Sequence, residues 1–218
     1  MSIAQVTRER IISYRDRRER ILYLLQRYGQ YVQGRVLDVG CAEATLRAYC
    51  RGGYCGIDKD GSADVTLDLE EGELPFGDRE FDTVVCTDVL EHIDQLHALF
   101  DEMVRVCRRY LIISLPNCWG VFWSAIIRGR GELKQYGLPL NCPEDRHRWF
   151  FNYEQAERFV RGQAARWNLT LRVCEPYYGS DRFLKKLVQL LYQVNETRRR
   201  NVFARALWVV LEKEVPGE

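Results

Sequence analysis

The order of apolar and polar positions along the chain predicts strands and helices in alternation. Short apolar runs predict strands over residues 35–39, 54–57, 65–67, 81–86, 110–113, 169–175 and 203–212. Apolar residues at helical spacing predict helices over 8–28 and 43–51, from 94, from 152 to about 167, and from 181. This alternation indicates a mainly parallel sheet that is covered by helices on both faces.

Polar residues and glycines mark the ends of several elements. Gly29 and Gly34 end the first helix, and Asp94 and Asn152 are expected to cap the helices that begin beside them. The run over 203–212 follows a helix, so it can close the sheet as an antiparallel edge strand.

We therefore predict one α/β domain with a Rossmann-like, doubly wound fold. Its sheet is expected to be seven-stranded and mainly parallel, with an antiparallel last strand, an N-terminal helix and a lid inserted after the fifth strand. The expected parts are a helical cap (1–34), a ligand-binding core (35–115), a lid (116–152) and the rest of the sheet (153–218). A length of 218 residues suits a single domain.

Composition and cysteine usage indicate the cellular compartment in which this protein is expected. No apolar run approaches the about 18 residues of a membrane span, and the N-terminus lacks the apolar segment of a secretory signal. None of the eight cysteines forms a C-x-x-C pair, so neither a zinc ribbon nor a thioredoxin-type site is expected. A reducing, cytoplasmic compartment fits this cysteine usage.

Charge is unevenly distributed although the net charge is only +1. Residues 1–35 hold 8 basic and 3 acidic residues, 36–103 hold 4 basic and 17 acidic ones, and 121–205 hold 16 basic and 8 acidic ones. These charges either lie on solvated helix faces or face an anionic ligand across a cleft.

Acidic residues stand where four predicted strands end. Asp38 is followed by Gly40 at the first strand end, and Asp58, Asp68 and Asp88 follow the next three strands. The carboxyl ends of parallel strands form the ligand-binding edge of such sheets, and a carboxylate there can accept both ribose hydroxyls. Neither a Walker motif nor G-x-G-x-x-G is present, so nucleoside triphosphate and NAD are not expected.

Residues 35–115 resemble the class I S-adenosylmethionine-dependent methyltransferases, particularly their small type-11-like form. The resemblance lies in V-L-D-V-G-C, L-P-F, F-D and V-L-E-H-I, which occur in the family's order and spacing. It implies that Asp38 and Gly40 hold the methionine end of the cofactor, Asp58 the ribose, and Asp68 with the Leu69 amide the adenine. The full set of cofactor-binding residues implied is Asp38, Gly40, Cys41, Ala42, Asp58, Lys59, Asp68, Leu69, Asp88 and Val89.

The first turn departs from the family's usual G-x-G-x-G, because Ala42 and Ala44 replace two glycines. Residues 109–151 also resemble the methionine-biosynthesis W-type proteins, through S-L-P-N, G-L-P and the later His147. Those proteins share the fold but can act as partners of an acyltransferase. A non-catalytic partner protein is therefore one alternative.

Methyl transfer from a sulfonium needs an aligned acceptor, and an oxygen acceptor also needs a base. Of the three histidines, His147 and His92 are the expected catalytic residues, whereas His97 is expected to be solvated. Asp88, Glu91, His92 and His147 also form a candidate metal site. Their spacing is similar to that of the metal-dependent small-RNA 2′-O-methyltransferases, and a related E-H pair occurs in ubiquinone-pathway O-methyltransferases.

Aromatic residues are concentrated in the expected lid, with 8 in the 37 residues of 117–153. They either line an acceptor pocket or pack a lid helix onto the sheet. The expected substrate residues are Trp119, Trp123, Tyr136, Arg146 and Trp149. The Arg-rich helix over 8–28 is expected to fold over the cofactor.

The sequence therefore predicts an S-adenosylmethionine-dependent methyltransferase that acts on a small or medium-sized acceptor. Arginines among the lid aromatics suit an acceptor with a carboxylate or phosphate. The alternative acceptor is RNA or another polyanion, methylated in a metal-assisted 2′-O-type reaction, for which binding should weaken steeply with salt.

Overall fold

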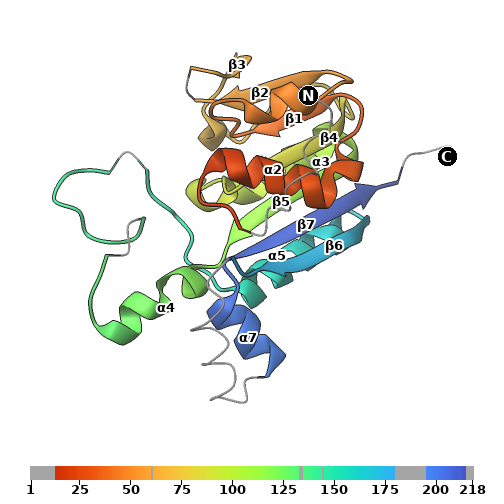
Figure 1. Cartoon of the computed structure of the whole chain (residues 1–218). Coiled ribbons are helices and arrows are strands. Elements are labelled where there is room, and N and C mark those ends of the chain that lie inside the picture. The colour runs from red at the N-terminus through yellow and green to blue at the C-terminus, as the bar shows by residue number, and fades with distance from the viewer. Residues whose placement is uncertain (1–12, 60, 133–134, 144, 180–194, 215–218) are drawn as a thin grey trace.

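One sheet lies at the centre of the computed structural model, which describes residues 13–59, 61–132, 135–143, 145–179 and 195–214. Within these residues the sheet has seven strands in the order β3-β2-β1-β4-β5-β7-β6 (Figure 1). The strands are β1 (Val36–Val39), β2 (Tyr54–Asp58), β3 (Val65–Thr66), β4 (Phe81–Thr87), β5 (Cys107–Pro116), β6 (Leu169–Tyr177) and β7 (Ala206–Lys213). The pairs from β3 to β5 are parallel, and β7 is antiparallel to both neighbours. The predicted α/β fold with an antiparallel last strand is confirmed.

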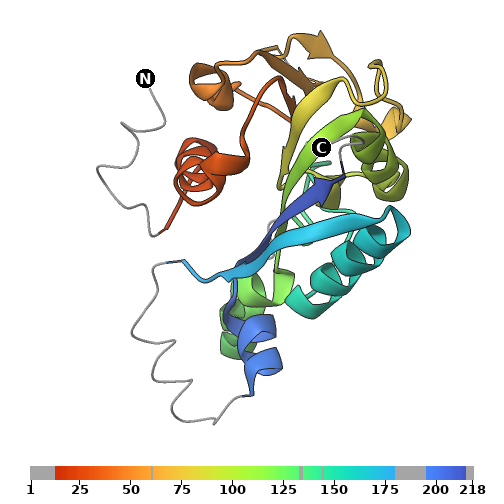
Figure 2. The ribbon, with the colours of Figure 1, turned by 90° about the vertical axis from the view of Figure 1, so that its right-hand side faces the viewer.

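Helices cover both faces of this sheet (Figure 2). Those described are α2 (Arg17–Tyr28), α3 (Leu96–Val106), α4 (Cys118–Arg128), α5 (Tyr153–Arg166) and α7 (Glu196–Phe203). Leu24 of α2 packs in a core with Trp208 of β7. On the other face, Phe100 of α3 and Val160 of α5 share the second core. Because strand side chains alternate between faces, successive residues of β5 and β7 supply both cores.

The position of β7 differs from the expected edge strand. Its residues Ala206–Leu211 are all buried, and β7 pairs with β5 on one side and β6 on the other. An edge strand would leave one row of backbone N–H and C=O groups unpaired and one flank exposed. A run of consecutive apolar residues therefore suits this central place in the sheet.

Several predicted element boundaries are wrong. Asp94 does not cap its helix: α3 begins at Leu96, and the Asp94 N–H instead donates to a Glu70 carboxylate oxygen at 2.9 Å. Residues 43–51 form only a short 3₁₀ helix, Thr45–Tyr49, which follows Ala44 in the left-handed region at φ 52°. The last strand begins at Ala206 rather than at 203, because Phe203 is the last residue of α7.

Helices α2 and α5 begin at side-chain caps; α2 begins at Arg17, so residues 13–16 of the helix predicted over 8–28 are not helical. The Asp16 carboxylate accepts a hydrogen bond from the Glu19 N–H at the start of α2. Asn152 and Gln155 form a reciprocal capping box at the start of α5, which confirms the predicted cap. The helix expected from 181, and residues 8–12 of the first predicted helix, lie outside the described residues.

No helix in the described ranges is both long and apolar enough to cross a bilayer. The eight cysteines are free, and four of them lie in strands as small apolar residues. The cytoplasmic location stays a prediction.

Replacing Asn117 with Ala should lower the free energy of unfolding by about 2 kcal/mol. The buried Asn117 Nδ2 donates to the carbonyls of Arg200, Asn201 and Ala204, which join the start of α4 to the end of α7. Urea denaturation measures the change, with Gln95→Ala at an exposed position as the control. Equal stability of Asn117→Ala and the control would show that this junction contributes nothing.

Candidate functional site

A cleft of about 310 Å³ opens at the carboxyl ends of the parallel strands. It is lined by seven of the predicted cofactor residues, namely Gly40, Asp58, Lys59, Asp68, Leu69, Asp88 and Val89. Asp38 and Cys41 line a smaller cavity that shares Gly40 with the cleft. Parallel pairing brings these strand ends to one edge, so residues distant in the sequence surround one space.

The turn after β1 fits tightly against the strand-end loop of β4. Gly40 has φ +73°, and a Cβ there would lie 2.3 Å from Val89 Cγ2, so only glycine fits. Ala42 and Ala44, which replace glycines of the family pattern, also have positive φ values of 46° and 52°. Each costs about 1–2 kcal/mol relative to glycine. The Ala42 N–H donates to Asp58 Oδ2 at 2.9 Å, so this strained turn is tied to the end of β2.

Asp38 is buried beneath the turn, with only 4% of its surface exposed. Burial raises its pKa from 3.8 to about 6, although a hydrogen bond from the Tyr54 hydroxyl at 2.9 Å opposes that rise. The group therefore changes its charge near neutral pH.

Asp88 is held at the entrance of the cleft by two partners. It lies in the left-handed region at φ 50°, and its Oδ1 accepts a hydrogen bond from Ser114 Oγ at 2.5 Å. Its Oδ2 forms an ion pair with Arg20, which projects from α2. This helix thus brings Arg20 to the end of β4, and its place over a bound cofactor stays a prediction.

A second cavity, also of about 310 Å³, adjoins the cleft. The two spaces share Arg17, Asp88, His92 and Asp145. The second is further lined by Val121 and Phe122 of α4 and by lid residues Tyr136 and His147. The cleft is lined by five acidic and four basic residues, whereas the second cavity adds aromatic, aliphatic and imidazole groups to three acidic and two basic ones.

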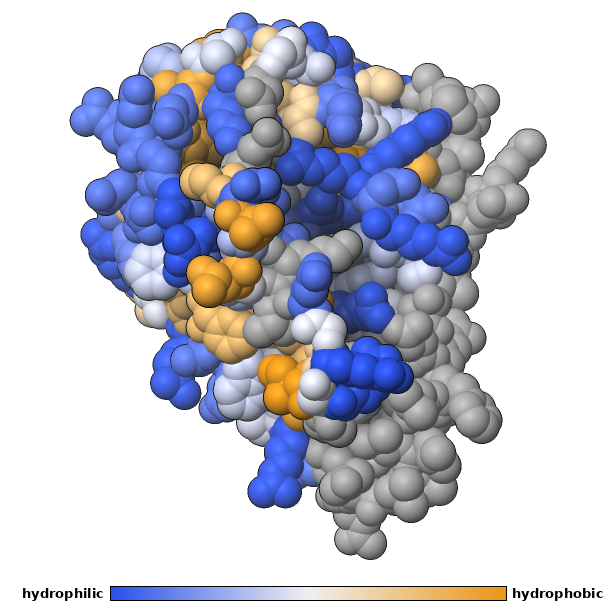
Figure 3. Space-filling view, turned by 90° about the vertical axis from the view of Figure 1, so that its left-hand side faces the viewer, coloured by the Kyte–Doolittle hydropathy of each residue, from blue (hydrophilic) through white to orange (hydrophobic). Residues whose placement is uncertain are grey.

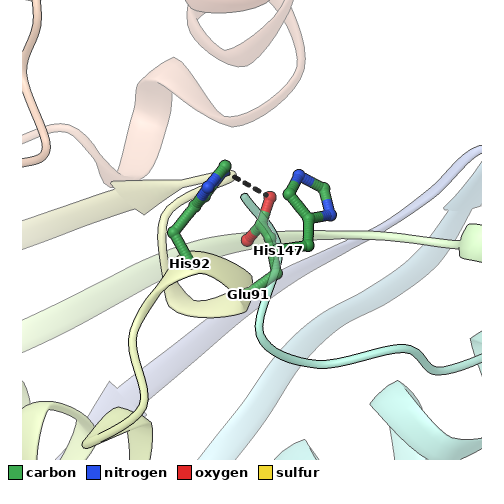
Figure 4. A group of neighbouring side chains, drawn as sticks. All are labelled: Glu91, His92 and His147. Atoms are coloured by element: carbon green, nitrogen blue, oxygen red, sulfur yellow. Dashed lines mark ion pairs between the residues drawn. The ribbon is translucent and has the colours of Figure 1, made fainter. Parts of the chain in front are cut away.

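Glu91, His92 and His147 gather where the two cavities meet (Figure 4). One potential ligand atom from each lies within 4.8 Å of the others. Glu91 is 1% exposed, and its Oε2 has no hydrogen-bond partner among the described residues. Burial, and then the nearby Asp88 charge, raise the pKa of Glu91 well above its usual value. Asp88 itself is not in the group, because its oxygens contact Ser114 and Arg20.

The two imidazoles differ in their surroundings. His92 Nδ1 lies 2.7 Å from Asp145 Oδ1, and its Nε2 lies 3.7 Å from Glu91 Oε1. His147 Nδ1 lies 2.9 Å from the Tyr136 hydroxyl. Burial, followed by the neighbouring His92, lowers the pKa of His147 to about 4, so its ring is neutral at neutral pH.

Backbone hydrogen bonds bring the lid to this cluster. The Arg148 and Trp149 N–H groups both donate to the Glu91 carbonyl, at 2.7 and 3.3 Å. Trp149 Nε1 donates to the Ile93 carbonyl at 2.8 Å. These bonds set His147 beside Glu91 although the two are far apart in the sequence.

The expected substrate residues occupy different places. Tyr136 lines the second cavity and Arg146 lines the cleft. Trp123 packs against Phe203 of α7 with ring centroids 5.8 Å apart, and Trp119 is 45% exposed; neither lines the two larger cavities. Their substrate roles stay predictions.

Sequence reasoning missed Arg17 as an individual site residue. It lines the cleft, the second cavity and the smaller one, and it forms no ion pair within the described part of the chain. Asp145, which contacts His92, was missed as well. The arginines of the first predicted helix indicated that this helix folds over the site. No local pattern indicates which of these arginines enters it.

The lid side of the molecule is mostly hydrophilic, with hydrophobic side chains in small separate groups (Figure 3). Leu138 and Leu140 in the lid are fully exposed, and Ile126 of α4 is 60% exposed. The arginines that line the cleft from the lid are Arg146 and Arg148.

The sequence model of a methyltransferase domain family matches residues 13–163. Comparison with curated protein sequences finds no match. The structure is similar to that of a SAM-dependent methyltransferase from Archaeoglobus fulgidus, with a TM-score of 0.57 and 17% identity over 92% of this chain and 96% of that one.

Two further structures share the fold. The small RNA methyltransferase HEN1 aligns with a TM-score of 0.58 and 16% identity over 90% of this chain but 25% of its own. Magnesium protoporphyrin IX methyltransferase from Synechocystis, determined with bound SAH, aligns with a TM-score of 0.51 and 17% identity over 89% of this chain and 80% of its own. At these identities the similarity shows a common fold.

Replacing Asp38 with Asn should flatten the dependence of stability on pH. Because the folded-state pKa is raised from 3.8 to about 6, the wild-type free energy of unfolding falls as the pH rises between these values. Between pH 4 and pH 8, the free energy of unfolding of Asp38→Asn should therefore rise by up to about 3 kcal/mol relative to that of the wild type. Urea denaturation across this pH range measures the difference in the free energy of unfolding, with Glu73→Gln, exposed and away from these cavities, as the control. Parallel wild-type and Asp38→Asn curves would contradict it.

Proposed function

Because the chain belongs to the methyltransferase domain family, we propose that it transfers a methyl group from S-adenosylmethionine to a small or medium-sized, anionic acceptor. The observation that carries this proposal is the cleft at the strand ends, lined by Asp58, Asp68 and Asp88, which joins a second cavity at Asp88 and His92. A cationic adenosine derivative suits the first space, and an acceptor suits the second.

The residues of the cleft fit the cofactor. Asp58 would take the ribose hydroxyls, and Asp68 with Leu69 would frame the adenine, while Lys59 and Val89 border the same space. Asp38, Cys41 and the Gly40–Ala42 backbone would hold the methionine end. S-adenosylmethionine, when bound, supplies an electrophilic methyl group on a sulfonium.

The second cavity supports the acceptor half of the proposal. Phe122 and Val121 form part of its apolar wall, and Arg17, which lines both spaces, offers a guanidinium group to a carboxylate or phosphate. Arg146 lines the adjoining cleft. His147 is neutral and can take the proton of an acceptor hydroxyl, with His92 beside it. RNA stays an alternative acceptor, which a steep loss of binding with salt would identify.

A metal-assisted form of the reaction is the second candidate. The unpartnered, buried Glu91 Oε2 beside two imidazoles favours it, since carboxylate and neutral imidazole are ligands of divalent ions. Glu91, His92 and His147 would hold the ion, which would lower the pKa of an acceptor hydroxyl. A cation there would also offset the cost of burying the Glu91 charge.

Replacing Asp58 with Ala should weaken binding of S-adenosylhomocysteine by about 10- to 100-fold, because a charged acceptor for two hydroxyls is lost. Calorimetry on the full chain measures the dissociation constant. Glu73→Ala removes the same charge at an exposed position away from the cleft and should leave binding unchanged. Undetectable binding to the wild-type protein would instead favour the non-catalytic partner role.

Replacing Glu91 with Gln should weaken Mn²⁺ binding by at least about tenfold, because the charged ligand at the centre of the cluster is lost. Electron paramagnetic resonance counts the free ion in a titration of the wild-type chain and the variant. Glu43→Gln, which is exposed, serves as the control. Methyl transfer that survives exhaustive chelation, or equal Mn²⁺ affinity of Glu91→Gln and wild type, would exclude the metal-assisted form.

A further inference from the structure

The Tyr136 hydroxyl lies at the centre of a small hydrogen-bond network in the lid. It is 2.6 Å from the Trp149 carbonyl oxygen, 2.9 Å from His147 Nδ1 and 3.0 Å from Cys118 Sγ. Cys118 is the first residue of α4, whereas the other groups belong to the lid segment before α5. One oxygen therefore contacts three separate polar groups.

The number of protons in this network decides which group donates in each contact. A phenol has one proton to donate, and a carbonyl oxygen can only accept. At 2.6 Å the Trp149 carbonyl must therefore receive the Tyr136 proton. The Tyr136 oxygen is left as the acceptor for its other two neighbours.

The contact with His147 then requires a proton on Nδ1. In a neutral imidazole only one nitrogen carries a proton, so Nε2 keeps a lone pair. Cys118 can donate its S–H to the same oxygen, because burial raises the pKa of that thiol and keeps it protonated. Every member of the network is satisfied in this arrangement.

We propose that Tyr136 is a positioning residue that holds His147 in the tautomer protonated at Nδ1 and directs the Nε2 lone pair to the Glu91 cluster. Figure 4 shows one ring nitrogen of His147 toward Glu91 and the other away from it. The use of the lone pair, on an acceptor proton or a divalent ion, rests on the proposed function, whereas the tautomer does not. An imidazole with the opposite tautomer would present an N–H to this cluster and could neither take a proton nor bind an ion there.

The same hydroxyl links this tautomer to the position of the lid. It ties Trp149, whose N–H donates to the Glu91 carbonyl, to the start of α4. The Tyr136 network and the hydrogen bonds to the Glu91 carbonyl therefore act on the same lid segment. A lid displaced from the strand ends would lose both the position of His147 and its fixed tautomer.

Long-range ¹H–¹⁵N correlation spectra of the full chain, labelled on histidine, test the proposal at neutral pH. The chain has only three histidines, so His147→Gln identifies the signal. In the wild-type protein Nδ1 of His147 should carry the proton, and in Tyr136→Phe most of the population should carry it on Nε2. A wild-type ring protonated on Nε2, or an unchanged tautomer in Tyr136→Phe, would overturn the proposal.

Tyr153→Phe is the matched control. The Tyr153 hydroxyl is buried and, among the described residues, has no hydrogen-bond partner, so its removal should leave the His147 tautomer unchanged. The wild-type spectrum tests the tautomer even if Tyr136→Phe fails to fold. Calorimetry with S-adenosylhomocysteine on the same samples should show equal affinity, within about twofold, for wild type and Tyr136→Phe. Absence of wild-type binding would count against the proposed function and leave the tautomer result standing.

Discussion

The candidate site depends on the backbone carbonyl of Glu91, which accepts hydrogen bonds from two successive lid residues. Glu91 lies in a short 3₁₀ helix that follows β4, and its carbonyl oxygen accepts from the N–H groups of Arg148 and Trp149. This contact joins the rigid edge of the sheet to a segment with little regular structure of its own. Without it, the cavity beside the cleft would lose His147 and one wall.

Charge is the second constraint on this edge. Asp38 and Glu91 are buried, and burial raises the pKa of both. The basic N-terminal segment lies over these acids, with Arg20 paired to Asp88 and Arg17 at the cavities. The uneven charge along the sequence is therefore in part an internal pairing between the first helix and the strand ends, rather than only a set of solvated helix faces.

Much of the fold could be predicted because side-chain burial leaves a periodic trace in the sequence. Strand β5 and helix α5 lie where apolar spacing and the Asn152 cap placed them. The place of β7 could not be predicted, because pairing with β5 and β6 is decided between segments far apart in the chain. Helix α4 was left as one of two alternatives, since its aromatic residues fit a pocket lining as well as a helix.

For the site, the sequence by itself determined the acidic strand ends around Gly40, because parallel strands bring Asp58, Asp68 and Asp88 to one edge whatever the loops do. Only the tertiary structure decided which other groups reach them. Trp123 turns to α7 and Tyr136 to His147, because packing and hydrogen bonds across the lid, which no local pattern records, fix each side chain.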